Sequence, residues 1–114
     1  MATRHRERSV IFDVVDDHLV RIVTFPDGGS YTHRCTRAMF ENVVYAIEER
    51  ATEGVTLDSL VSALDAPSTQ VNVALEFMKE RTCVVTRSRR NYPASNCLFE
   101  DAMCEYWFLA QLPY

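Results

Sequence analysis

Four cysteines and three histidines are the side chains of this 114-residue chain best suited to bind a metal ion. The cysteines form no CxxC pair, and only one histidine, His33, lies two positions from a cysteine, Cys35. A structural zinc site needs four such ligands gathered in space, and this spacing does not indicate such a cluster. We therefore predict no metal site and reduced, mostly buried thiols at Cys35, Cys83, Cys97 and Cys104.

Motifs for enzymatic catalysis are absent from the sequence. Phosphate-binding loops need several closely spaced glycines, whereas the glycines here are Gly28, Gly29 and Gly54. The sequence contains no HExxH and no GxSxG motif. Adjacent acids at positions 16–17 and 48–49 are typical of a turn and of a helix surface. We predict that the chain is not an enzyme, has no catalytic residue and needs no cofactor.

The net charge of −4 opposes strongly electrostatic binding of nucleic acid, because contacts to phosphates supply most of the non-specific affinity. The charge is uneven, however. Four arginines lie between residues 81 and 90, and no acid lies between Arg81 and Phe99. Eleven of the twelve basic residues are arginine, whose planar fork suits phosphates and carboxylates. This cluster is either a phosphate-binding surface or an ordinary solvated one.

Residues 9–34 have the pattern of a three-stranded antiparallel meander. Segments rich in β-branched residues alternate with two turn sequences, Asp16-Asp17-His18 and Pro26-Asp27-Gly28-Gly29. The strands are predicted at 9–15, 19–25 and 30–34. A sheet of this kind buries one face, so another part of the chain must cover it. Residues 1–8 are predicted to form a flexible basic tail containing Arg4, Arg6 and Arg8.

Three amphipathic helices are predicted in the middle of the chain, because apolar residues recur there at helical spacing. Each begins with a hydroxyl side chain suited to cap it, and the first ends before Gly54. The helices are Thr36–Ala51 with Thr36 as cap, Leu57–Leu64 with Thr56 as cap, and Thr69–Arg81 with Ser68 as cap. A short strand at Cys83–Thr86 and a polar, basic loop or wing tip at 88–95 follow.

The C-terminal stretch permits two interpretations. A helix over Leu98–Gln111, capped by Asn96, places several large apolar residues at helical spacing. The alternative is a strand from Tyr106 to Leu109. We favour the helix, and we treat residues 1–114 as a single α+β domain.

The segment Thr56–Val85 has the pattern of two capped helices, a tight turn between them and a strand, with few connecting residues. In this it resembles the winged helix-turn-helix superfamily of bacterial transcription factors, over roughly Thr36 to Ala110. The resemblance implies a winged-helix core at 36–114, with strands around a basic wing at Arg87–Asn91 and a final helix. The alternatives are another small α+β domain and a helical hairpin packed on a sheet. The chain departs from the superfamily at Asp65 and Thr82, where its members often have glycine.

The resemblance also implies a site, in which the third helix enters the major groove of double-stranded DNA and the wing reaches the backbone. The DNA-binding residues would be Ser68, Thr69, Gln70, Asn72, Arg87, Arg89 and Arg90. Val73 and Phe77 are apolar where readers of DNA usually carry polar side chains, and Glu76 would repel phosphate. They indicate an alternative, a winged-helix module that binds a protein partner through Val73 and Phe77. A third interpretation has Phe77 packed beneath the N-terminal sheet.

We therefore expect a DNA-binding transcriptional regulator, with the protein-binding module as the alternative. No run of 18 apolar residues is present, and no apolar segment follows the charged N-terminus. On these grounds we expect no membrane segment and a cytoplasmic location.

Apolar side chains crowd the final predicted helix on nearly all sides. One face can close the core, and the remainder must meet the N-terminal sheet or a second subunit. We predict a homodimer with Trp107 or Phe108 in the contact, which would suit a DNA site of two half-sites. Coverage of this helix by the meander within one chain is the alternative.

Overall fold

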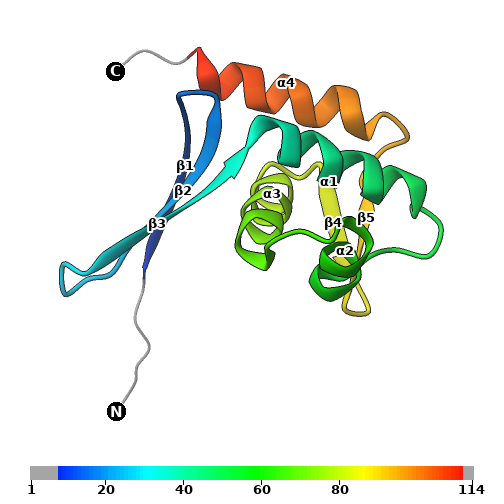
Figure 1. The fold of residues 1–114 in the computed structure, drawn as a ribbon, viewed down its shortest axis with the longest axis horizontal. Coiled ribbons are helices and arrows are strands. Elements are labelled where there is room, and N and C mark those ends of the chain that lie inside the picture. The colour runs from blue at the N-terminus through cyan, green and yellow to red at the C-terminus, as the bar shows by residue number, and fades with distance from the viewer. Residues whose placement is uncertain (1–7, 112–114) are drawn as a thin grey trace.

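The computed structural model describes residues 8–111, which form an α+β fold. Its elements are β1 (Ser9–Val15), β2 (His18–Thr24), β3 (Ser30–Thr36), α1 (Arg37–Glu49), α2 (Leu57–Leu64), α3 (Ser68–Glu80), β4 (Val84–Arg87), β5 (Arg90–Pro93) and α4 (Leu98–Ala110). The predicted class, a meander followed by helices, a hairpin and a C-terminal helix, is confirmed (Figure 1). Apart from Arg8, the predicted basic tail lies outside the described residues, as do residues 112–114.

The N-terminal sheet pairs β1, β2 and β3 antiparallel in sequence order. Its first hairpin turns through Asp16 and Asp17, whose φ angles of 52° and 62° suit a tight two-residue turn. Phe12, Arg21 and His33 lie opposite one another across the three strands, on the face that meets the helices. The predicted meander is confirmed, although β2 begins one residue earlier and β3 runs two residues further than expected.

Hydroxyl side chains cap α1 and α2 as predicted. Thr36 Oγ1 accepts a hydrogen bond from the Met39 N–H at 3.1 Å. At α2, Thr56 and Ser59 each accept from the other's backbone N–H, at 3.0 and 2.9 Å. This reciprocal capping box satisfies two N–H groups that the helix itself cannot pair.

The predicted caps of α3 and α4 are wrong. Pro67 holds the cap position of α3 and offers no side-chain acceptor, while Ser68 is already helical. Cys97 holds the cap position of α4, also without a side-chain bond. Asn96 was expected to cap this helix, but the nearby side-chain contacts come from Ser95. Its hydroxyl accepts a hydrogen bond from the Cys97 N–H and donates one to Asp101. The α4 helix itself is confirmed over the alternative strand.

Asp65 and Thr82, which follow α2 and α3, adopt left-handed backbone with φ of 49° and 59°. These are the two positions where the chain departs from the winged helix-turn-helix pattern by lacking glycine. Both positions therefore have the left-handed conformation that glycine adopts most easily, although neither residue is glycine. The steric strain is greater at Thr82 than at Asp65, because threonine is β-branched.

The β4–β5 hairpin closes through a two-residue tip, Ser88 and Arg89, with φ of 50° and 67°. The predicted wing at Arg87–Asn91 is therefore too wide, because Arg87 ends β4 and Arg90 begins β5. A turn with two left-handed residues matches the strand twist and needs no further loop. The polar loop predicted at 88–95 is likewise shorter, since β5 occupies residues 90–93.

The core gathers around α1. Phe40 of α1 lies 5.8 Å from the Phe77 ring of α3 and 5.5 Å from the Tyr106 ring of α4, centroid to centroid. α4 runs beside α1 on the side of the molecule away from α2 (Figure 1). None of the helices within residues 8–111 combines the length and the hydrophobicity needed to span a membrane.

Candidate nucleic-acid interface

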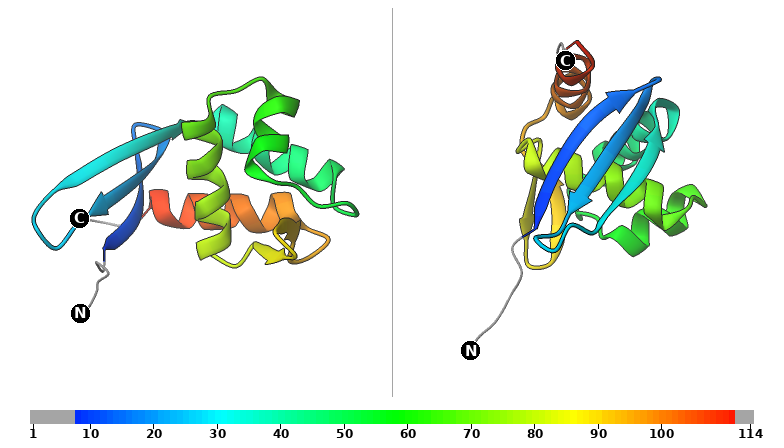
Figure 2. Two further views of the ribbon diagram at one scale, coloured as in Figure 1. Left: turned by 90° about the horizontal axis from the view of Figure 1, so that it is seen from below. Right: turned by 90° about the vertical axis from the view of Figure 1, so that its left-hand side faces the viewer.

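α3 lies across one face of the molecule, between the N-terminal sheet and the β4–β5 hairpin, with α1 and α4 behind it (Figure 2, left). Six of its residues are buried. Its partly or fully accessible residues recur at helical spacing and include one polar row, Thr69, Asn72, Glu76 and Lys79. We call this row the α3 stripe. It is the polar side of the helix that solvent reaches, fully at Thr69 and partly at the other three residues.

Val73 and Phe77 do not lie on the accessible face of α3, contrary to the partner-binding hypothesis. Both are completely buried. Phe77 meets the Phe12 ring of β1 edge-on, with 5.3 Å between centroids. The reason is the N-terminal sheet, which packs on this side of α3 and excludes solvent from it. The interpretation of Phe77 as a residue beneath the sheet is confirmed, and the proposed surface strip is wrong.

The N-terminus of α3 is accessible, and Ser68 and Thr69 are exposed there. Because no side chain caps this end, the first N–H groups of the helix are available to solvent or to an anion. Gln70 has another role, since its Oε1 accepts the N–H of Thr36 at 3.2 Å and so joins α3 to the end of β3. Of the four residues predicted on this helix, Ser68, Thr69 and Asn72 are accessible without such a contact.

The three hairpin arginines differ in what they contact. Arg89 is exposed at the tip, and Arg87 is exposed with its guanidinium 4.3 Å from the centroid of the Tyr92 ring. Arg90 instead donates to two carbonyl oxygens of the α1–α2 connection, those of Glu53 at 2.8 Å and Gly54 at 3.0 Å. We therefore assign Arg90 to anchoring the hairpin, which leaves Arg87 and Arg89 as its exposed arginines.

The hairpin is fixed to the helices through Val55 and Asn91. Their backbones exchange hydrogen bonds of 2.9 and 2.8 Å. The buried Asn91 side chain donates to the Val55 carbonyl at 3.1 Å and accepts from the Thr86 hydroxyl at 2.7 Å. Beside this pair, a β-carbon on Gly54 would lie only 2.7 Å from the Tyr92 ring. The hairpin is therefore held against the α1–α2 connection by hydrogen bonds and close packing.

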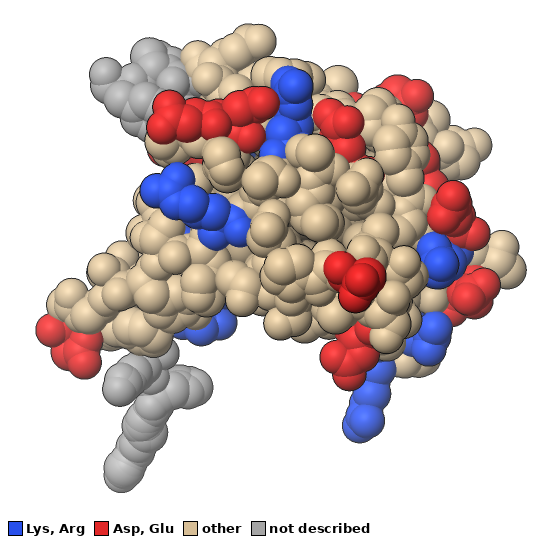
Figure 3. Space-filling view, viewed as in Figure 1, with Lys and Arg blue, Asp and Glu red and all other residues tan. Residues whose placement is uncertain are grey.

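Charges of both signs lie on and beside the α3 stripe. Lys79 pairs with Glu76 at 3.2 Å, and Glu80 pairs with Arg81 at 2.8 Å. Basic and acidic side chains are also interspersed on the face shown in Figure 3, which carries no continuous basic surface. Contacts to phosphate would therefore come from a few individual cations rather than from a broad positive field.

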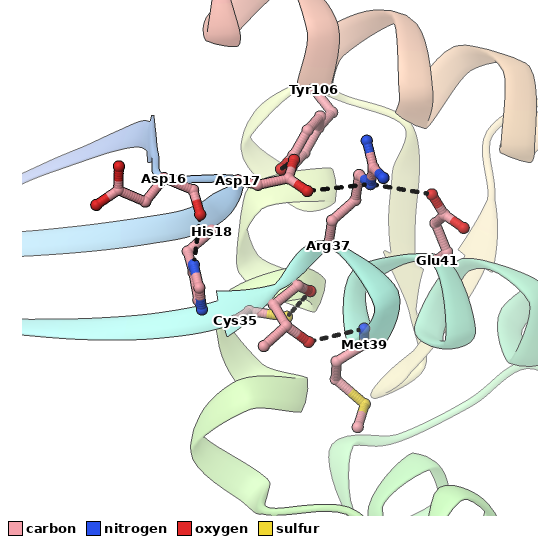
Figure 4. A network of polar contacts seen from close by, with 9 residues as sticks. Asp16, Asp17, His18, Cys35, Arg37, Met39, Glu41 and Tyr106 are labelled. Atoms are coloured by element: carbon pink, nitrogen blue, oxygen red, sulfur yellow. Dashed lines mark hydrogen bonds and ion pairs between the residues drawn. The ribbon is translucent and has the colours of Figure 1, made fainter.

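A polar cluster joins the N-terminal sheet to α1 and α4 (Figure 4). Asp17 accepts a hydrogen bond from the Tyr106 hydroxyl at 3.0 Å and lies 3.5 Å from Arg37 Nε. Arg37 also pairs with Glu41 at 3.7 Å and lies over the Trp107 ring, 5.2 Å from its centroid. Burial and the bond to Asp17 raise the pKa of Tyr106 above its ordinary value. Because these groups pair with one another, we assign the cluster a structural role.

The cysteines divide into two buried and two exposed residues. Cys35 and Cys83 are buried, whereas Cys97 and Cys104 are exposed, so the prediction of mostly buried thiols holds for only two of them. Burial raises the pKa of Cys35 to about 12, and burial together with Glu105 raises the pKa of Cys83 to about 11. In the part of the chain that the structure describes, no three His, Cys, Asp or Glu residues gather as a metal site would require.

One charged residue that the sequence analysis passed over, Arg21, is almost completely buried. Only 7% of its surface is exposed. It lies on the sheet face that packs against α3. The alternation along β2 could have indicated this, because Arg21 shares a face with Leu19 and Val23, and both are buried.

Comparisons with protein-family models, with curated proteins and with solved structures find no match for this chain. Its function must be inferred from its own geometry.

Proposed function

We propose that this protein is a winged-helix DNA-binding regulator of transcription. The observation that carries the proposal is the placement of α3, which crosses one face of the molecule with its polar stripe accessible and the hairpin beside it (Figure 2). A helix placed in this way suits a major groove, and an adjacent hairpin that bears arginines suits the neighbouring backbone.

In this proposal Thr69 and Asn72 contact base edges. An asparagine amide can pair with the edge of adenine through two hydrogen bonds, which gives sequence preference. Ser68 and the uncapped N–H groups of α3 contact a phosphate, since the positive end of the helix dipole lies there. Arg87 and Arg89 contact phosphate or the minor groove.

Glu76 limits the affinity that this interface can reach, because its carboxylate on the α3 stripe repels phosphate. With Arg87 and Arg89 as the principal cations, few counterions are released on binding. We therefore expect weak non-specific binding, and we expect the specific complex to depend on base contacts and on the use of two copies.

Selection from fragmented genomic DNA of the source organism tests the proposal. At roughly 50 mM salt, where phosphate contacts are strongest, we expect the chain to retain a subset of fragments that share a short motif. Asn72→Ala should weaken the motif preference while leaving the circular dichroism spectrum unchanged. Failure of the wild-type chain to retain any fragment at this salt would refute the proposal.

We also propose that two copies associate through α4. Trp107 and Phe108 are 42% and 60% exposed. They line a shallow, largely apolar groove of about 550 Å³ together with Phe99, Met103, Cys104 and others on α4. A two-fold pairing covers the same residues on both copies, because such an interface is self-complementary. In the view from below α4 lies behind α3, so we expect pairing through α4 to leave both α3 stripes accessible (Figure 2).

A module that binds protein rather than DNA is the second candidate. It is favoured by Glu76 on the α3 stripe and by the net charge of −4. Its contact surface cannot be Val73 and Phe77, which are buried. The selection experiment separates the two candidates, since this one predicts that no genomic fragment is retained at low salt.

A further inference from the structure

A groove of about 380 Å³ lies between the N-terminal sheet and the C-terminal half of α3. Arg8, Val10, Phe12 and Arg21 line it on the sheet side, and Glu76, Lys79 and Glu80 line it on the helix side. This volume lies within the range of pockets that hold small organic molecules. The groove lies away from the hairpin and from the N-terminus of α3, and it shares Glu76 and Lys79 with the α3 stripe.

The unusual feature of this groove is the environment of Arg21. Its side chain is more than nine-tenths buried, and its Nε is the one buried side-chain nitrogen or oxygen within residues 8–111 that has no hydrogen-bond partner. A guanidinium always carries its charge at physiological pH, so burial without a partner destabilises the fold. Native proteins generally satisfy such groups, and an exception calls for an explanation such as a bound molecule.

The acids that line the groove do not supply that partner. Glu76 is paired with Lys79 at 3.2 Å, and Glu80 is paired with Arg81 at 2.8 Å. No ion pair within 4.0 Å joins either acid to Arg21. Across the sheet, the neighbours of Arg21 are Phe12 and His33, and neither is an anion at neutral pH. Within the described residues, Arg21 is a buried cation beside a cavity, and its Nε–H is not matched by an acceptor.

We propose that this groove binds a small organic carboxylate, with Arg21 holding the carboxylate and the apolar walls holding the rest of the ligand. A planar carboxylate matches the guanidinium fork through two charge-assisted hydrogen bonds. Val10 and Phe12 provide an apolar wall for an alkyl or aryl group. Glu76 and Glu80 at the groove edge repel any anion, and they repel a doubly charged phosphate more than a singly charged carboxylate. This inference does not depend on DNA binding.

Thermal unfolding of the full chain in the presence of simple carboxylates tests the inference. We expect hexanoate or benzoate at millimolar concentration to raise Tm in a saturable manner, because a ligand that binds only the folded state stabilises it. Hexanol, benzyl alcohol and inorganic phosphate should leave Tm unchanged. A rise with phosphate equal to that with carboxylate would overturn the assignment of the ligand class.

Arg21→Met is the matched variant, since it keeps most of the side-chain volume and removes the charge. We expect it to weaken carboxylate binding by roughly 10- to 100-fold, the range expected for the loss of hydrogen bonds to a charged group. Its unliganded Tm should rise, because the buried charge is gone. The control is Arg34→Met on β3, an exposed arginine whose loss should leave carboxylate binding intact.

The NMR signal of the Arg21 Nε–H group in the wild-type protein provides a measurement that does not rely on any variant folding. The chemical shift of this signal should change as hexanoate is added and should reach a plateau. The hexanoate concentration at half of the change should agree with the concentration at half of the Tm increase. If neither this signal nor Tm responds to any probe, the groove holds only water and the inference is wrong. A Tm response that persists in Arg21→Met would also contradict it.

Discussion

Side chains of the same residue type in this protein differ in exposure and in contacts, according to the elements that pack on them. Arg89 and Arg90 are neighbours, yet Arg89 is exposed at a hairpin tip and Arg90 donates to two backbone carbonyls. Cys35 of β3 is buried, and Cys104 is exposed on α4. Chemical reactivity should therefore follow burial rather than residue type.

Alkylation of the cysteines tests this at the scale of single residues. We expect iodoacetamide to modify Cys97 and Cys104 quickly in the folded protein and to spare Cys35 and Cys83. The thiolate is the reactive form, and the pKa values of Cys35 and Cys83 are about 12 and about 11. Peptide mass spectrometry after brief exposure measures the difference. Similar modification of all four in the folded protein would contradict the described burial.

The same pKa shifts give a dependence of stability on pH. Both folded-state values lie above the ordinary value of 9.0, so the buried thiols favour the neutral form. Their contribution to stability is present below pH 9.0 and is lost as the pH rises through about 11 and about 12. Cys35→Ala should reduce this loss at alkaline pH.

Only two of the four helix caps could be predicted from the sequence, and the accessibility of helix faces could not be predicted. Thr36 and Thr56 act as caps because a hydroxyl needs only the next three residues to do so. The sequence left open whether Val73 and Phe77 lie on the accessible side of α3 or beneath the sheet, because the pattern of that helix alone does not reveal a sheet packed on it. Arg21 is a second residue whose burial was not predicted, and it is a charged residue on the sheet face that packs against α3.

At the scale of elements, the strands and helices follow the periodicity of the sequence closely. Backbone strain from positive φ lies in the connections between them. Among residues 8–111, six non-glycine residues have positive φ, and each lies in a turn or just after a helix. The sequence predicted the positions of these turns from their polar residues. It did not predict that Ser88 and Arg89 would close the hairpin directly, because neither residue favours left-handed backbone.

Thr82→Gly should stabilise the protein by about 0.5–1 kcal/mol. Relief of the left-handed strain at φ 59° contributes about 1–2 kcal/mol, and the greater freedom of glycine in the unfolded chain removes roughly half of that. Denaturant unfolding measures the change. Thr24→Gly, an exposed residue at the end of β2 without positive φ, is the control and should destabilise. Destabilisation by Thr82→Gly would contradict the strain argument.

Gly54→Ala should destabilise the protein by about 1–3 kcal/mol and loosen the hairpin. The added β-carbon would lie 2.7 Å from the Tyr92 ring, so that ring and the hairpin must move. Gly28→Ala is the matched control, because Gly28 also has positive φ but has no heavy atom within 4 Å of an added β-carbon. If thermal unfolding shows equal losses for the two variants, the contact between residue 54 and Tyr92 does not anchor the hairpin.

At the scale of the whole molecule, the N-terminal sheet determines which surfaces remain accessible. It covers one side of α3 and contacts α4 through Asp17 and Tyr106 (Figures 1 and 4). The sequence predicted this sheet and predicted that something must cover one of its faces. It offered two candidates for that cover, the third helix through Phe77 and the C-terminal helix, without deciding between them, because packing between distant elements leaves no local periodic signal. Trp107 and Phe108 remain exposed after this packing, which is why we expect a second copy.

Cross-linking at Cys104 tests the proposed dimer. Cys104 is the middle residue of α4 and lies in its apolar groove. If two copies pair through α4 in antiparallel fashion around a two-fold axis, their Cys104 residues face each other. Helix axes about 8–10 Å apart then bring these Cα atoms within disulfide range.

Mild oxidation should give a disulfide-linked dimer that Cys97→Ser retains and Cys104→Ser loses. Sedimentation without oxidant should give a dimer that Phe108→Asp dissociates. A single 13.1 kDa species at micromolar concentration, with no Cys104 cross-link, would contradict the dimer and would leave the α4 face without a function in assembly.

The salt dependence of binding to a selected DNA fragment tests most directly whether α3 and the hairpin form a DNA interface. The matched variants are Arg87→Ala/Arg89→Ala on the hairpin and Arg34→Ala on β3. Each phosphate contact contributes about 0.9 to the magnitude of the slope of log K against log salt. The hairpin variant loses two such contacts, so the magnitude of this slope should fall by about 1.8 per bound copy. Arg34→Ala should leave the slope unchanged. A hairpin variant with the wild-type slope and affinity would contradict the proposed interface.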